Sequence, residues 1–125
     1  MKYWIILIFA LYSCSFRSEK GIQFPDYVKV QIKSQELTIG EIEDLRDIFS
    51  ELESIKKDVY DKPDIIILGY NSENDGNPDM YCVFKKDGYI FVGDYFKAWA
   101  QRMKGRKSKC YLINEDLKSF LEIYY

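Results

Sequence analysis

Histidine is absent from this 125-residue chain. Its absence removes the commonest general base and the commonest metal-ligating side chain, and it leaves any Ser or Cys nucleophile without its usual partner. The chain also lacks a glycine-rich phosphate loop, an internal repeat and a low-complexity tract. We therefore expect a protein that is not an enzyme and that holds no cofactor.

A strong net charge is lacking too, since the formal charge is −2. No global field therefore points to nucleic acid as a partner. Apolar residues make up 47% of the chain and aromatic residues 17%, which is too rich in core-forming side chains for a disordered protein. The length suits one domain with a modest core.

Only one long apolar run is present, the ten residues from Tyr3 to Tyr12. It is too short to cross a hydrocarbon core of about 30 Å as a helix. Preceded by Lys2, it is typical of the apolar region of an export signal. The tetrapeptide Leu11-Tyr12-Ser13-Cys14 follows, and it resembles the lipobox of bacterial lipoprotein precursors.

The resemblance implies cleavage before Cys14 and lipid on its thiol, which would hold the protein in the bacterial cell envelope. Residues 1–13 would be the signal peptide, 14–25 a tether containing Gly21 and Pro25, and 26–125 a single domain. Ser15 replaces the Asp that favours retention at the inner membrane in that family. We therefore expect the outer membrane, with its periplasmic and surface faces both open. The alternatives are an ordinary cleaved signal or an uncleaved anchor, with Cys14 incidental.

With Cys14 carrying lipid, Cys82 and Cys110 remain as a pair in an oxidising compartment. Both lie in apolar runs that are typical of strands. The sequence therefore predicts a candidate disulfide between them, if neighbouring strands bring them together. The alternative is two buried free thiols that pack as small apolar groups.

Hydrophobic periodicity predicts an α+β fold. Apolar and polar residues alternate over 27–33, as in a half-buried strand. Thr38 and Glu41 then form a capping-box pattern, and the apolar positions from Ile42 to Ile55 recur at helical spacing. Residues 94–104 fit either a short helix that begins at Asp94 or a continued strand. Further strands are expected at 65–68, 80–84, 89–92 and 109–113, with a turn at 86–88 and a last helix capped by Asn114.

The element order is β-α-β-β-β-(α)-β-α. It indicates a two-layer sandwich, with a mainly antiparallel sheet of about five strands and two or three helices on one face.

One loop resembles the start of a calcium-binding loop, where alternating oxygen ligands precede a glycine. The candidate ligands are Asn71, Glu73 and Asp75, before Gly76. The twelfth position, where the EF-hand pattern requires an acid, is Cys82. An ordinary connecting loop uses the same residue types, so we predict no metal here.

Charge is divided along the chain. Between Glu36 and Asp58 eight acids stand against three bases, whereas between Lys85 and Lys109 eight bases stand against two acids. In an exported protein the natural partners of a basic segment are an acidic protein or an anionic envelope polymer rather than nucleic acid. The alternative is a solubilising loop that pairs loosely with the acidic helix. The candidate binding patch contains Tyr95, Trp99, Arg102, Lys104, Arg106, Lys107 and Lys109.

These features favour a lipid-anchored, non-catalytic binding module, of which an inhibitor or immunity protein against a toxin or lytic enzyme is one concrete form. An accessory subunit of an outer-membrane or cell-surface assembly is the second hypothesis. A hydrolase that acts through two carboxylates is the third.

Overall fold

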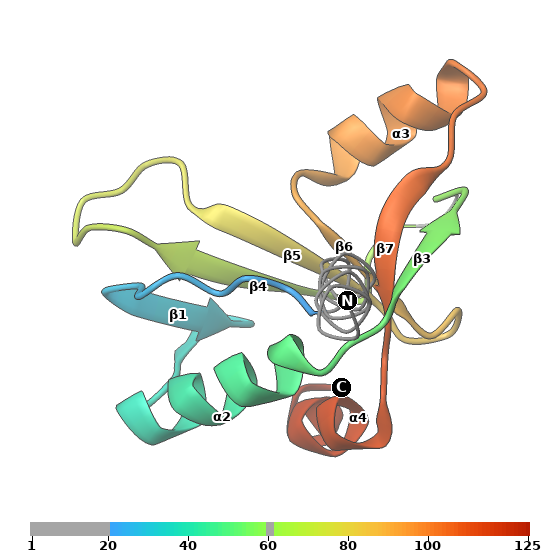
Figure 1. Ribbon diagram of the computed structural model, residues 1–125. Helices are drawn as coiled ribbons and strands as arrows, with labels where there is room; N and C mark the ends of the chain where they lie inside the picture. The colour runs from blue at the N-terminus through green and yellow to red at the C-terminus, as the bar shows by residue number, and fades with distance from the viewer. Residues whose placement is uncertain (1–20, 60–61) are drawn as a thin grey trace, which may run out of the picture.

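The computed structural model describes residues 21–59 and 62–125, which fold around one antiparallel sheet (Figure 1). The strand order is β2-β1-β4-β5-β6-β7-β3, and the sheet is not closed. The predicted α+β fold is confirmed, with seven strands where about five were expected. The strands are β1 (Lys29–Ile32), β2 (Gln35–Glu36), β3 (Ser54–Lys57), β4 (Ile65–Tyr70), β5 (Asp79–Phe84), β6 (Tyr89–Val92) and β7 (Ser108–Leu112). The helices are α2 (Ile39–Ser50), α3 (Tyr95–Met103) and α4 (Glu115–Leu121), which a 3₁₀ turn (Glu122–Tyr124) follows.

Helix α2 begins at the predicted capping box. The Thr38 hydroxyl accepts a hydrogen bond from the Glu41 amide at 3.2 Å, and the Glu41 carboxylate accepts one from the Thr38 amide at 3.0 Å. The predicted continuation of this helix to Ile55 is wrong, because α2 ends at Ser50 and residues 54–57 form edge strand β3. There Ile55 pairs with Cys110 of β7. Pairing with a distant strand overrides the local helical spacing.

The sheet has one face covered by α2 and α4, which lie below it in Figure 1. Side chains alternate along a strand, so the residues of β5 contribute in turn to the two faces of the sheet. Tyr81 and Val83 belong to the main core with α2 and α4, whereas Cys82 and Phe84 belong to a smaller cluster on the other face. The helices are thus not all on one face, because Ala98 of α3 closes this smaller cluster.

Residues 95–103 form helix α3, the first of the two predicted alternatives. The Asp94 carboxylate caps it by accepting a hydrogen bond from the Phe96 amide at 3.0 Å. Figure 1 shows α3 projecting from a corner of the sheet, away from α2 and α4. The final helix is capped as predicted, by Asn114 accepting from the Leu117 amide at 2.9 Å.

The domain begins earlier than the sequence predicted. Residues 21–25 were assigned to the tether, but Ile22 and Phe24 are buried in the main core. The amides of Gly21 and Ile22 donate to the carbonyls of Leu52 and Phe49, each at 2.8 Å. Burial of the two apolar side chains favours this ordered path over a free linker.

The candidate disulfide is not formed, and Cys82 and Cys110 are buried free thiols. Strand β6 lies between their strands, and its Phe91 pairs with both cysteines. Two strand spacings separate the Cα atoms by roughly 10 Å, whereas a bridge needs less than about 7 Å. Burial raises the pKa of Cys82 to about 11 and that of Cys110 to about 12. The alternative interpretation, two thiols packed in an apolar cluster, is correct.

We expect Cys82 and Cys110 to resist alkylation in the native protein at neutral pH, because both side chains are buried and little thiolate is present. Both should react fully when the protein is unfolded without a reductant. Mass spectrometry of the peptides measures the modification. An unreduced peptide pair joined through Cys82 and Cys110 would contradict the structure.

Candidate binding surface on α3 and β7

Helix α3 carries an exposed apolar stripe. Phe96, Trp99 and Met103 recur at spacings of three and four, which places them on one side of the helix. Their exposed fractions are 72%, 44% and 64%. Contiguous exposed apolar side chains of this size indicate an interaction surface more often than scattered ones do. We call these three residues the α3 stripe.

The neighbouring side of α3 attaches the helix to the sheet. Ala98 is fully buried, and Tyr95 packs against the same cluster beneath it. Tyr95 was placed in the predicted patch, but most of its ring serves this attachment, and Arg102 is half-buried at the next turn on this side. Burial of Tyr95 and Ala98 therefore leaves the α3 stripe facing outward.

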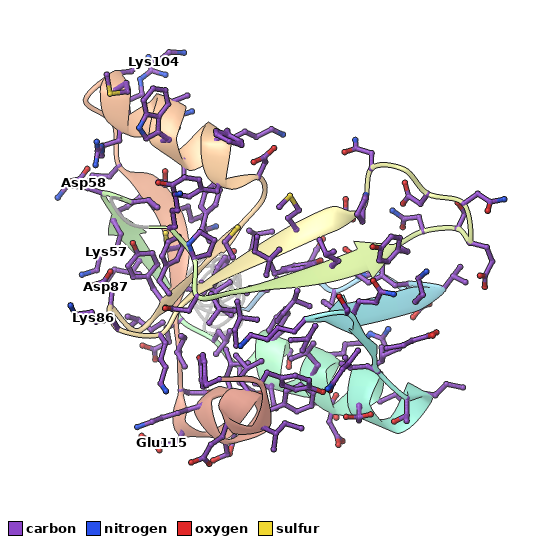
Figure 2. The ribbon with its side chains drawn as sticks, turned by 180° about the vertical axis from the view of Figure 1, so that it is seen from behind. Lys57, Asp58, Lys86, Asp87, Lys104 and Glu115 are labelled. Carbon is purple, nitrogen blue, oxygen red and sulfur yellow. The ribbon has the colours of Figure 1, made fainter. Side chains whose placement is uncertain are left out.

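The basic residues of the predicted patch lie where α3 leads into β7. Lys104, Arg106 and Lys107 are exposed around Gly105, and Lys109 is exposed on β7. Gly105 has a φ of +71°, a conformation that glycine adopts easily and that turns the chain after the helix. Figure 2 shows Lys104 at the far end of α3, pointing away from the rest of the domain.

A groove of about 430 Å³ lies between α3 and the ends of β6 and β7. Three lysines line it, Lys97 of α3, Lys107 just before β7 and Lys109 in β7, and no carboxylate from residues 21–59 or 62–125 does. Phe91 and Val92 supply apolar lining at the end of β6. We call this the basic groove. It opens on the side of α3 away from the stripe, since Lys97 is two positions before Trp99 and faces nearly the opposite way.

Two further polar residues line the basic groove, Gln101 and Ser108. The Ser108 hydroxyl is buried, and it finds no hydrogen-bond partner in the described part of the chain. The ring of Tyr111 lies beside the groove with the Lys109 ammonium 5.7 Å from its centre. Lys97, Gln101 and Ser108 were missed in the sequence, because only the fold brings the helix face against the start of β7.

The acidic helix does not neutralise this surface. Figure 1 places α2 below the sheet and α3 at the opposite corner, so the loose pairing considered for the basic segment does not occur between these two helices. The bases at the β5–β6 turn are separate as well, since Lys86 lies well away from Lys104 in Figure 2. Helix α2 is thus separated in space from the basic segment, but the end of the acidic segment is not, because β3 pairs with β7 and places Lys56 opposite Lys109.

In the candidate calcium loop, the carboxylate of Asp75 is hydrogen-bonded to the backbone of the loop itself. The two carboxylate oxygens of Asp75 accept hydrogen bonds from the amides of Asn77 at 3.0 Å and Asn71 at 3.1 Å. These backbone hydrogen bonds lower the pKa of Asp75, that from Asn77 most. Glu73 is exposed, and residues 21–59 and 62–125 hold no group of three acids or cysteines spaced for a metal ion. The loop therefore has the features of an ordinary connection.

A second groove, of about 600 Å³, lies between residues 21–25 and α2. Arg46 lines it and donates to the Phe24 carbonyl at 3.2 Å and to the Pro25 carbonyl at 3.3 Å. It also forms an ion pair with Asp26 at 3.1 Å. Because its donors hold the first described segment against α2, Arg46 has a structural role, and α3 with β7 remains the stronger candidate.

Comparisons with known proteins found no match: no family model, no curated protein and no solved structure is similar to this chain. Cys14, the signal peptide (1–13) and tether residues 14–20 lie outside the described residues. Within those residues, no helix has the length and apolar character that crossing a membrane requires.

Proposed function

We propose that this protein is a lipid-anchored, non-catalytic binding module of the bacterial cell envelope. Helix α3 and the start of β7 form its contact surface for an anionic macromolecule, a protein or an envelope polymer. One observation carries the proposal: the α3 stripe is exposed on a projecting helix, and Lys104, Arg106 and Lys107 are exposed in the segment that follows this helix.

The two parts of the surface have different physical roles. Aromatic and methionine side chains are enriched at the centres of protein interfaces, where they release water on binding. The flanking lysines and arginines attract an anionic partner over longer distances and fix its orientation. An apolar contact with a charged rim would suit an inhibitor or immunity protein, which requires no catalytic group.

The anchor rests on the lipobox-like sequence Leu11-Tyr12-Ser13-Cys14. Lipid contributes about 0.8 kcal/mol per buried methylene, so two or more chains give stable membrane residence. Few residues separate Cys14 from Ile22, the first buried residue in the described part of the chain, so the contact surface would stay close to the membrane. Metabolic labelling with a palmitate analogue should mark the wild-type chain. Labelling that persists in Cys14→Ala would refute the anchor.

The binding function is tested by affinity capture from an envelope extract. We expect one stoichiometric partner, and we expect Phe96→Ser with Met103→Ser to lower its recovery on the order of tenfold, as loss of an interface anchor does. Both side chains are largely exposed, so the fold should remain intact.

The matched control is Ile39→Ser with Ile123→Ser, which removes two apolar side chains that are each 78% exposed. They belong to α2 and to the 3₁₀ turn after α4, and Figure 1 shows α2 and α4 away from α3. Recovery should not change. Equal losses in both double variants, or none in either, would argue against α3 as the contact surface. A toxin or lytic enzyme as the partner would establish the inhibitor, and an integral outer-membrane complex would establish the accessory subunit.

A further inference from the structure

Strand β3 forms a free edge of the sheet. It is the last strand in the order and pairs with β7 on one side, and in the described part of the chain no strand lies on its other side. Figure 1 shows it as the outermost strand beyond β7. The opposite edge strand, β2, has only two residues, whereas β3 has four. An unpaired strand edge is a template for an added strand, and β3 is the longer of the two templates.

The register of β3 shows which of its backbone groups point outward. The Leu112 amide donates to the Glu53 carbonyl at 2.8 Å, which makes these two residues a hydrogen-bonded pair. Hydrogen-bonded and non-hydrogen-bonded pairs alternate along an antiparallel ladder, so the next residue of β3 that bonds toward β7 is Ile55. The N–H and C=O groups of Ser54 and Lys56 therefore point away from β7, toward the free edge.

The side chains on one face of this edge are cationic. Lys56 and Lys109 are exposed and lie directly opposite each other in a non-hydrogen-bonded pair, the arrangement in which facing side chains are closest. Like charges directly opposite each other on a sheet are destabilising, and neither lysine forms an ion pair with a carboxylate of the described residues. A carboxylate that an added strand placed beside Lys56 would offset this repulsion.

The other face of β3 is apolar at Ile55, which is half-buried against the smaller cluster closed by Ala98 of α3. An added strand would set one side chain beside Ile55 and the next beside Lys56, since side chains alternate along a strand. We infer that β3 binds an extended segment of another protein in which acidic and apolar residues alternate. Main-chain hydrogen bonds with Ser54 and Lys56 would hold the segment, and the two side-chain contacts would select it.

The lysines disfavour a second copy of this chain as the occupant. Two β3 edges paired with each other would gather Lys56 and Lys57 from both copies on one short edge, and such like charges oppose edge-to-edge pairing. An acidic segment meets the same lysines as partners. The inference goes beyond the proposed function, because it adds a contact at the sheet edge that requires neither the α3 stripe nor the anchor.

The test uses the full chain in a zwitterionic detergent, with a synthetic peptide of alternating glutamate and valine as the probe and amide NMR shifts as the readout. We expect saturable shifts at Ser54 and Lys56. N-methylation of the glutamate residues should abolish binding, because it removes the N–H groups that would face β3. N-methylation of the valine residues should leave binding intact, because their N–H groups would face away from β3.

Two variants at one position separate the charge from the backbone donor. Lys56→Gln removes the charge alone and should weaken peptide binding on the order of threefold. Lys56→Pro also removes the outward N–H and should weaken it on the order of tenfold or more. An edge strand tolerates proline where the N–H faces solvent, so β3 should still pair with β7. Lys33→Gln, in the turn between β1 and β2 at the opposite edge of the sheet, is the charge-matched control and should leave binding unchanged.

Equal binding of the two N-methylated peptides, or binding that leaves Ser54 and Lys56 unshifted, would overturn strand addition. A dimer of the chain that Lys56→Pro dissociates would overturn the choice of an acidic segment as the occupant. The capture experiment fails or succeeds separately, because it depends on Phe96 and Met103, which belong to α3 and not to β3.

Discussion

Phe49→Ala is expected to destabilise the domain by about 3–5 kcal/mol, the usual cost of truncating a fully buried phenylalanine. Phe49 lies in α2 with none of its surface exposed. Its ring packs edge-on against Phe24, with 5.2 Å between the ring centres, and in a tilted arrangement against Tyr81 of β5, with 5.4 Å between the centres. Alanine would leave a cavity where the first described segment, α2 and the sheet meet.

A loss of this size is comparable to the whole stability of a small domain, which is about 5–15 kcal/mol. Urea denaturation followed by circular dichroism measures the free energy of unfolding. Phe96→Ala is the matched control, because 72% of that side chain is exposed and its removal should change stability by no more than about 0.5 kcal/mol. A cost below about 1 kcal/mol for Phe49→Ala would mean that this aromatic cluster is not the centre of the core.

Gly69→Ala should destabilise the domain by about 3 kcal/mol, at the upper end of the range for overpacking. A Cβ atom at position 69 would lie 2.5 Å from two ring atoms of Tyr27. The Tyr27 ring cannot move aside easily, because its hydroxyl donates to Asp79 at 2.7 Å and lies 2.5 Å from that of Tyr81. The backbone cannot move either, since Gly69 pairs with Val30 on one side and Asp79 on the other.

The clash with Tyr27 can be separated from other effects of the substitution by a double-mutant cycle. In a Tyr27→Leu background the cost of Gly69→Ala should fall by about 1 kcal/mol or more, because the two residues are in direct contact. Gly76→Ala is the control, since a Cβ atom there meets nothing within 4 Å. A cost for Gly69→Ala that is the same in both backgrounds would show that the Tyr27 ring is not the obstacle.

The chain contains 11 tyrosines, and the burial of Tyr27 and Tyr81 shows that these two contribute to the core rather than to a contact surface. Both rings lie in the main core, and burial is the largest cause that raises the pKa of each. Among the described residues, Phe96 and Trp99 on α3 are the most exposed aromatic side chains. Composition alone cannot distinguish these roles, because tyrosine suits either environment.

For the candidate site, the basic run from Arg102 to Lys109 and the aromatic Trp99 indicated the segment of the chain but not how its residues are arranged. The structure places this segment on α3 and the start of β7, and its role in binding stays a prediction. The helical spacing of Phe96, Trp99 and Met103 could have identified the stripe, had the residues 95–103 been assigned to a helix alone. Ser108 carried no signal, since a serine in a strand is ordinary until a neighbouring helix buries its hydroxyl.

Features that depend on neighbours along the chain were determined by the sequence itself. The capping box at Thr38, the Asp87-Gly88 turn and the cap at Asn114 all use contacts within a few residues, and all three formed as expected. The lipobox resemblance at Cys14 is local in the same sense, and it remains a prediction.

Contacts between distant segments were decided only by the tertiary structure. Strand β6 lies between the strands that carry Cys82 and Cys110, so the two thiols cannot form a disulfide. Residues 54–57, whose spacing predicted a helix, form strand β3 and pair with β7. Ile22 and Phe24 join the core instead of a tether. In each case burial and backbone pairing across the fold outweigh the local preference, since they involve more apolar surface and more hydrogen bonds than a few neighbouring residues supply.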